Sequence, residues 1–249
     1  MSMRTILLTL EYRGTNYVGW QVQPNGLSVQ QVVEEALAEL CGEQVRIHSS
    51  GRTDAGVHAR CMLAHLQTAS NLPLQAFRDG LNRYLPQDIA VREAREMPAG
   101  FHARYDAGGK WYRYTLYRGP VRSPMSAETA WQLRGELDLP AMRRAAGMLV
   151  GRHDFQAFRS SSCAAKTTER EIFSIDFSAE GDLLHIDFRG SGFLKNMIRM
   201  LVGTLIQVGQ GRRPASDILK LLAGEPDLRS GPTAPAHGLC LMEVWLREV

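Results

Sequence analysis

The segment SSGRTDAGVHA at residues 49–59 places several side chains capable of chemistry next to one another in a loop. Gly51 and Gly56 allow backbone angles that other residues avoid, so this loop can adopt a strained conformation that makes the Asp54 side chain accessible to a ligand. The alternative is a structural turn in which Asp54 hydrogen-bonds its own backbone and pairs with Arg52. Taken alone, the segment favours that turn, because local turn chemistry is the usual role of an aspartate near glycine.

A second candidate group lies in the segment FLKNMIRMLVGTLIQVG at residues 193–209, which predicts a long, mostly buried helix. Its polar residues fall at i, i+3, i+7 and i+11 and form one narrow face: Asn196, Arg199, Gly203 and Gln207. An arginine in apolar surroundings needs an anionic partner, because an unpaired buried charge is strongly destabilising. A carboxylate on a nearby loop would supply it. The alternative is that this face simply lies in water.

The third candidate group is aromatic. The segment KWYRYTLYR at residues 110–118 alternates as a strand, with Tyr112 and Tyr114 on one face and Trp111 and Arg113 on the other. Rings beside arginine are a sequence-tolerant way to hold single-stranded or flipped bases. The alternative is that these are ordinary core tyrosines of a strand.

The elements that would position these groups repeat in order along the chain. The first half predicts strand, helix, two strands, helix and strand, at residues 4–13, 28–42, 44–48, 60–68, 73–84 and 88–96. The second half predicts a strand, a helix, a hairpin, two helices and a strand, at residues 110–118, 139–151, 171–190, 193–209, 214–223 and 239–248. Each half is therefore a βαββαβ unit, with one helix added in the second.

Two such units predict an α/β protein of the α+β class. They would join most economically into one broad, mainly antiparallel sheet with helices on one face, leaving the other face open for a ligand. Residues 1–105 form the expected N-terminal half, which carries the Asp54 loop. Residues 106–249 form the expected C-terminal half, which carries the tyrosine strand and the arginine helix.

Composition narrows the class of protein. The chain has 249 residues, 44% of them hydrophobic, so it can fill its own core. No apolar run approaches the roughly 20 residues of a membrane span, and no signal peptide is recognised, so we expect a cytoplasmic protein. The four cysteines form no CxxC pair and the seven histidines form no HExxH motif, so we expect no metal site. His58 is expected to brace the loop rather than to catalyse.

Charge alone does not identify a partner, since the net charge is only +3. Its distribution is more informative, because residues 139–170 hold a local excess of positive charge and only four of the 29 basic residues are lysine. Arginine suits bidentate phosphate recognition, although an arginine-rich genome produces the same bias. The basic residues that we expect to contact phosphate groups are Arg143, Arg144, Arg152, Arg159, Lys166, Arg212 and Arg213.

Five motifs together resemble the tRNA pseudouridine synthase A (TruA) family in order and spacing. They are GRTDAGVHA at 51–59, KWYRY at 110–114, HDFQAFR at 153–159, GFLKNMIRMLVG at 192–203 and AHGLCLMEVW at 236–245. The resemblance covers essentially the whole chain. It implies a cofactor-free isomerase, working as a homodimer on the anticodon stem-loop of tRNA, that detaches a uracil from C1' of its ribose, turns it and rejoins it through C5.

The resemblance also implies roles for individual residues. The catalytic aspartate of the family falls on Asp54, its active-site tyrosine on Tyr112, and its carboxylate-pairing arginine on Arg199. Arg52 matches the arginine of the same loop, which contacts phosphate or fills the space left by the extruded base. Attack at C1', attack at C6 and deprotonation at C2' are all compatible with a single carboxylate, and the residues do not choose among them.

Two other classes of function remain open at this point. A non-catalytic RNA-binding module could use the same sheet and aromatic side chains. A hydrolase that excises bases could use an aspartate near C1', and it would release free uracil where an isomerase retains the base.

Overall fold

The computed structural model describes residues 3–247, so residues 1, 2, 248 and 249, including the end of the last expected strand, lie outside it. The chain divides into two compact units, which are described separately. Unit 1 holds the residues up to Gly109 and those from Cys240 onward, and unit 2 holds Lys110–Leu239. The predicted boundary after residue 105 lies close to this division. The last strand, which was assigned to the second half, falls in unit 1 from Cys240 onward, where it is parallel to a strand of that unit.

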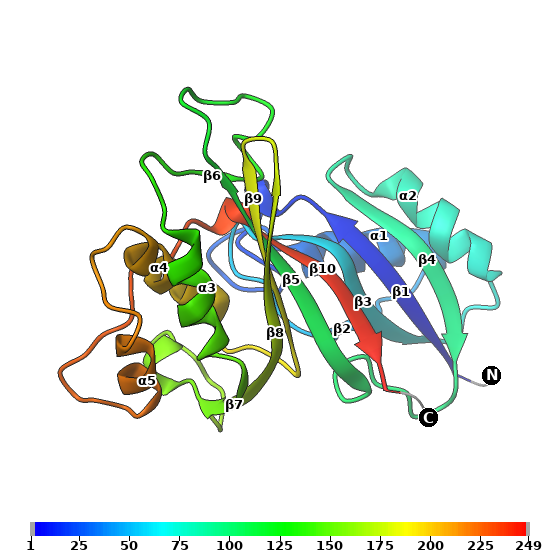
Figure 1. Ribbon diagram of the computed structural model, residues 1–249. Coiled ribbons are helices and arrows are strands. Elements are labelled where there is room, and N and C mark those ends of the chain that lie inside the picture. Colours follow the sequence, from blue (N-terminus) through cyan, green and yellow to red (C-terminus); the bar gives the residue numbers. More distant parts are fainter. Residues whose placement is uncertain (1–2, 248–249) are drawn as a thin grey trace. The chain divides into compact units, whose positions relative to one another are not determined.

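Unit 1 follows the predicted order of strand, helix, two strands, helix and strand (Figure 1). Its elements are β1 (Arg4–Tyr12), η1 (Gly14–Asn16), α1 (Val29–Cys41), β2 (His48–Ser49), β3 (His58–Thr68), η2 (Ala76–Gly80), α2 (Leu81–Tyr84), β4 (Ile89–Met97) and β10 (Leu239–Leu246). The strands lie in the order β4-β1-β3-β10, and β2 pairs with β3. β1 is antiparallel to β3 and β4, whereas β10 is parallel to β3. The helices α1 and α2 contact each other on one face of the sheet.

The helix α1 begins and ends where the sequence predicts. Ser28 caps its N-terminus, since its Oγ accepts a hydrogen bond from Gln31 N at 3.2 Å. Gly42 ends it in the left-handed conformation, with φ of 69°. The face that α1 turns toward the sheet is fully buried and comprises Val29, Val33 and Leu37. Local capping chemistry and apolar spacing therefore account for this helix.

His65 in β3 is a buried imidazole, only 4% exposed, whose ring contacts the rings of His48 and His102. Burial lowers its pKa to about 4, and the two neighbouring imidazoles act in the same direction. The carboxylate of Asp106 opposes this shift weakly. His65 is therefore neutral in the folded protein at neutral pH.

Acidification from pH 7 to pH 5 is expected to reduce the free energy of unfolding by about 2 kcal/mol through His65 alone. The unfolded chain protonates this imidazole near pH 6.5, whereas the folded protein does so only near pH 4, so stability is lost as the pH falls between these values. Urea unfolding at the two pH values measures the loss. The neutral variant His65→Gln is the comparison, and an equally steep loss in that variant would contradict this account.

Unit 2 contains the predicted strand, helix, hairpin and two further helices, together with two short strands that the sequence did not predict, β6 and β7 (Figure 1). Its elements are β5 (Ala107–Tyr117), β6 (Trp131–Gln132), α3 (Leu139–Gly147), β7 (Gly151–Asp154), η3 (Gln156–Phe158), β8 (Glu169–Glu180), β9 (Leu183–Gly190), α4 (Met197–Gly209), α5 (Asp217–Leu222) and η4 (Ala236–Gly238). The strands lie in the order β5-β9-β8-β7 with antiparallel neighbours, and β6 is parallel to β5. α3 contacts both α4 and β8.

The helix α4 begins at Met197, four residues later than predicted. Its N-cap, Asn196, has φ of 62°, which is a left-handed conformation that cannot continue a helix backward to residue 193. Apart from this start, the predicted burial is confirmed, because ten of the thirteen residues of α4 are buried. The expected arginine face is thus carried on a helix that is fixed by the core of unit 2.

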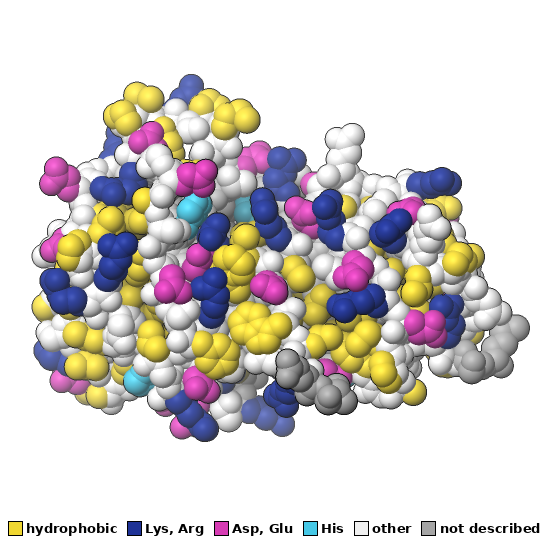
Figure 2. All heavy atoms as spheres, turned by 45° about the vertical axis from the view of Figure 1, so that its right-hand side comes forward, with side chains coloured by type: hydrophobic (Ala, Val, Ile, Leu, Met, Phe, Trp, Pro, Cys, Tyr) yellow, Lys and Arg dark blue, Asp and Glu magenta, His cyan; other side chains and the backbone are white. Residues whose placement is uncertain are grey.

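These observations confirm the α+β class with mainly antiparallel strands in each unit. Among residues 3–247, no helix combines the length and apolar character needed to cross a membrane. On the face shown in Figure 2, Lys and Arg side chains are interspersed with Asp and Glu, so charge does not mark a ligand site in this view. The site must be located from individual contacts.

Candidate active site

Asp54 lies half-buried in a tight turn between β2 and β3. Val57 N donates a hydrogen bond to Asp54 O at 3.1 Å, which closes a four-residue turn. Gly56 occupies its third position with φ of 78°, the positive angle that a type II turn requires there. The predicted glycine-dependent bend is therefore confirmed at Gly56.

A second segment, residues 14–20, holds this turn from the side. Gly19 forms an isolated β-bridge with Asp54, and Trp20 N donates to Thr53 O at 3.1 Å. The approach is so close that a Cβ added to Gly19 would lie 2.6 Å from Thr53 O. A Cβ on Gly14 would lie 2.0 Å from the carbonyl oxygen of Val57. Only glycine fits at either position, so the two backbones fix each other.

Two buried side chains complete the support. Tyr12 Oη and Thr53 Oγ1 are hydrogen-bonded at 2.8 Å, directly before Asp54 in the chain. Gly14 N donates to His58 Nδ1 at 3.0 Å, so the accepting nitrogen of His58 carries no proton. His58 thus braces the loop, as the sequence predicts. Sequence reasoning missed Tyr12 and the glycines, although the spacing GTNYVG at residues 14–19 between a strand and a helix was a signal for a close approach.

In unit 2, β5 places its rings on alternate faces, as predicted. Tyr112 is buried, and its ring meets that of Phe193 edge to face, with centroids 5.5 Å apart. Tyr114 is fully buried and donates from its hydroxyl to Pro235 O at 2.9 Å. Burial raises the pKa of Tyr114 far above its usual value. Tyr114 is therefore a core residue, whereas Tyr112 lies near the residues that lead into α4.

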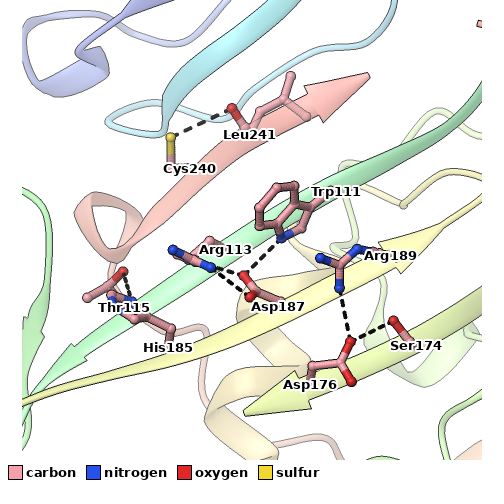
Figure 3. A network of polar contacts seen from close by, with 10 residues as sticks. All are labelled: Trp111, Arg113, Thr115, Ser174, Asp176, His185, Asp187, Arg189, Cys240 and Leu241. Atoms are coloured by element: carbon pink, nitrogen blue, oxygen red, sulfur yellow. Dashed lines mark hydrogen bonds and ion pairs between the residues drawn. The ribbon is translucent and has the colours of Figure 1, made fainter. Parts of the chain in front are cut away.

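The opposite face of the unit 2 sheet carries a network of ion pairs (Figure 3). Arg113 donates twice to Asp187, at 2.8 Å each, and Trp111 Nε1 donates to the same carboxylate at 2.9 Å. Burial opposes ionisation of Asp187, but these hydrogen bonds hold its pKa below the usual range. The guanidinium of Arg189 lies 4.6 Å from the Trp111 ring and pairs with Asp176 at 3.0 Å. The charged side chains of this network pair with one another, so the network stabilises the sheet.

Arg199 in α4 is half-buried and held in one orientation within unit 2. Its Nε donates to Ala234 O at 2.7 Å, and its Nη1 donates to Asn196 Oδ1 at 2.9 Å. Ala234 N returns a hydrogen bond to Arg199 O at 3.1 Å. The neighbouring Gly203 is in close contact with Pro232, whose carbonyl oxygen would lie 1.8 Å from an added Cβ. The alternative that this face of the helix lies in water is therefore wrong, because residues 231–234 cover it.

The basic residues that were expected to contact RNA fall into three groups. Arg152 pairs with Glu169 at 3.0 Å, with both side chains largely exposed. Arg213 is mostly buried and donates to Gln207 Oε1 and to Arg229 O. The rest are exposed or half-buried on unit 2, and they are Arg143, Arg144, Arg159, Lys166 and Arg212. In unit 1, Arg52 is exposed. In the described part of the chain, no group of three or more His, Cys, Asp or Glu side chains could hold a metal ion.

Comparison with known proteins now identifies the class. A family model described as tRNA pseudouridine synthase matches residues 9–106 and 145–245, which include Asp54 and Arg199 but not Tyr112. tRNA pseudouridine synthase A of Syntrophotalea carbinolica is 60% identical over 97% of this chain and 96% of that protein. The enzyme of the same name from Citrifermentans bemidjiense is 57% identical over 99% of both chains. The chain belongs to the tRNA pseudouridine synthase A family, and it is therefore an isomerase.

Solved structures add less. One described as "Structure of H/ACA RNP bound to a substrate RNA containing 2'-deoxyuridine" matches with a TM-score of 0.39 and 12% identity, covering 81% of this chain and 44% of that chain. A similarity of this size carries no argument about the site.

Proposed function

We propose that this enzyme converts uridine to pseudouridine in the anticodon stem-loop of tRNA, at about positions 38 to 40, with the Asp54 carboxylate as the nucleophile. The observation that carries the proposal is the turn itself. Main-chain atoms of Asp54 and of its neighbours hold it in place. A rigid backbone with a reactive side chain at its bend is the arrangement that nucleophilic catalysis needs.

Arg199 and Tyr112 are the proposed partners of Asp54 in this chemistry. A guanidinium within a few ångströms lowers a carboxylate pKa by roughly 1 to 3 units and keeps it ionised. Arg199 suits this role because two hydrogen bonds already fix its orientation. Tyr112, steadied by Phe193, would pack against the extruded uracil and assist the proton movement at C5. Arg52 would contact phosphate or occupy the space that the extruded base leaves.

The reaction balances without an added reactant. The bond from N1 to C1' breaks, a bond from C5 to C1' forms, the C5 hydrogen leaves as a proton and N1 gains one. The carboxylate enters by attack at C1', by attack at C6 or by deprotonation at C2', and all three routes are compatible with a single carboxylate. Extruding the target nucleotide costs a few kcal/mol, less in a loop or at a stem end, which suits an anticodon-arm substrate.

Incubation of the intact protein with tRNA tritiated at uridine C5 tests the function. An isomerase releases tritium while the base stays in the chain. A base-excising hydrolase would release free uracil, and a non-catalytic RNA-binding module would release neither. Absence of tritium release from a complete tRNA pool would contradict the proposed function. Sequencing of the modified tRNA then tests the anticodon-arm positions separately.

Phosphate contact by the basic side chains of unit 2 is the proposed means of holding the tRNA body. The residues concerned are Arg143, Arg144, Arg152, Arg159, Lys166, Arg212 and Arg213. Arg152 and Arg213 already bind partners within the protein, so we expect these two to contribute least to phosphate binding. We further propose that the protein is a homodimer, as the family resemblance implies, and that it acts in the cytoplasm. Sedimentation of the purified protein with and without tRNA tests the dimer.

Tyr12→Phe is expected to lower kcat about tenfold and the free energy of unfolding by about 1 kcal/mol. The change deletes the hydroxyl that holds Thr53, so the residue next to Asp54 loses its buried anchor. Tritium release and urea unfolding measure the two effects, with Tyr84→Phe at an exposed position of unit 1 as the control. If Tyr12 acts through Thr53, the double variant with Thr53→Val is no worse than either single variant, whereas additive losses would contradict the assignment.

A further inference from the structure

Unit 1 contains four aromatic rings in contact with one another, which we call the ring column: Tyr105, His102, His65 and His48. Ring centroids lie 4.3 Å apart between Tyr105 and His102, 4.7 Å between His102 and His65, and 5.3 Å between His65 and His48. Phe101 meets His65 edge to face at 5.9 Å. His48 and His102 also contact each other, with centroids 5.8 Å apart, so the rings connect the loop after β4 with the strand β2.

Only His65 within the ring column is buried, since His48 and Tyr105 are both exposed. His65 is 4% exposed, whereas Tyr105 is 67% exposed. The backbone around Tyr105 is nevertheless fixed, because Tyr105 N and Asp106 N both donate to His102 O at 3.0 Å. His102 N in turn donates to Asp106 Oδ2 at 2.8 Å. The backbone that carries this exposed ring is thus fixed, so binding of a partner to the ring does not have to order the loop.

The charge beside this ring favours an anionic partner. The guanidinium of the exposed Arg104 lies 6.0 Å from the centroid of the Tyr105 ring. A rigid aromatic ring next to arginine is the combination that holds unpaired bases and their phosphates. RNA is favoured over a protein partner, because this enzyme family acts on RNA and the ring and the arginine match both parts of a nucleotide.

The ring column is also connected to the catalytic loop. His48, its last ring, lies in β2, and the chain runs from there into the turn that carries Asp54. The six residues from His48 to Asp54 span at most about 20 Å, so His48 lies within a few nucleotide lengths of Asp54. An RNA bound at Tyr105 would therefore be held through a nucleotide other than the target uridine.

We propose that Tyr105 and Arg104, at one end of the ring column, bind an unpaired nucleotide of the tRNA outside the Asp54 site, by stacking on its base and pairing with its phosphate. The proposal rests on tRNA as the substrate of the proposed function. It assigns to residues 104–105 a contribution to substrate affinity and none to the chemical step.

Tyr105→Ala is expected to weaken tRNA binding by the full-length protein about tenfold, because one stacked base is lost. Tyr105→Phe and Tyr105→Trp keep an aromatic ring, so their affinity for tRNA should stay within about twofold of that of the parent protein. If the tyrosine bound RNA through a hydrogen bond from its hydroxyl, both variants would lose affinity. Tyr84→Ala, at a tyrosine of unit 1 that is 51% exposed, is the matched control and should change nothing. Filter binding of a labelled tRNA pool at fixed salt measures all four, and kcat at saturating tRNA should be unchanged.

Arg104→Gln is expected to reduce the slope of log affinity against log salt by about one, as for a single phosphate contact. Equal binding by Tyr105→Ala and Tyr84→Ala would overturn the proposal. So would a loss of self-association in Tyr105→Ala with tRNA affinity intact, which would make this surface a protein contact. If the parent protein binds tRNA but releases no tritium, the proposed function fails, and the binding comparison still decides the role of this surface.

Discussion

Asp54→Asn is expected to lower tritium release from C5-labelled tRNA by at least about a thousandfold, the largest effect on activity of any single change in this chain. The amide has nearly the shape of the carboxylate but is a poor nucleophile and a poor base. Because main-chain hydrogen bonds hold the turn, the variant should remain folded, which urea unfolding checks. Single-turnover assays with excess enzyme measure the chemical step without product release.

The control for this prediction is Asp79→Asn, which removes an exposed carboxylate of the same unit. It should leave tritium release unchanged within about twofold, since exposed ion pairs contribute little. tRNA affinity should also be retained in Asp54→Asn, because the variant gains no charge repulsion toward phosphate. Retention of a tenth or more of the parent rate by Asp54→Asn would exclude Asp54 as the nucleophile.

Gly203→Ala is expected to have the largest effect on stability, lowering the free energy of unfolding by about 3 kcal/mol or more. The added Cβ would lie 1.8 Å from Pro232 O, and a backbone atom in a packed segment cannot move aside cheaply. The segment 231–234 would have to shift, and with it Ala234 O, the acceptor for Arg199 Nε. Activity at low temperature should therefore fall even in molecules that remain folded.

Thermal unfolding and tritium release measure the two consequences of Gly203→Ala. Gly147→Ala is the control, since an added Cβ there meets nothing within 4 Å. That change should be neutral or slightly stabilising, because alanine loses less backbone entropy on folding. A thermal midpoint for Gly203→Ala equal to that of the control would show that residues 231–234 yield more easily than their packing indicates.

Local sequence patterns predicted the helices and strands well, because each pattern depends only on residues that are close together in the sequence. Ser28 and Gly42 mark the ends of α1 through capping interactions that span only a few positions. The turn at Gly56 follows equally from the residues beside it. The start of α4 was predicted four residues too early, because apolar spacing continues through Asn196, where the backbone is left-handed.

By itself, then, the sequence determined the class of fold, the strand and helix order, the presence of a glycine-bent loop around Asp54 and, through its motifs, the family. Only the tertiary structure decided that β10 pairs with β3, that residues 14–20 hold the Asp54 turn, and that residues 231–234 cover Arg199. These contacts join parts of the chain that lie about 35 to 180 residues apart. Short-range periodicity and capping carry no information about which distant backbone will fill a given gap, since that depends on the register and close packing of the folded chain.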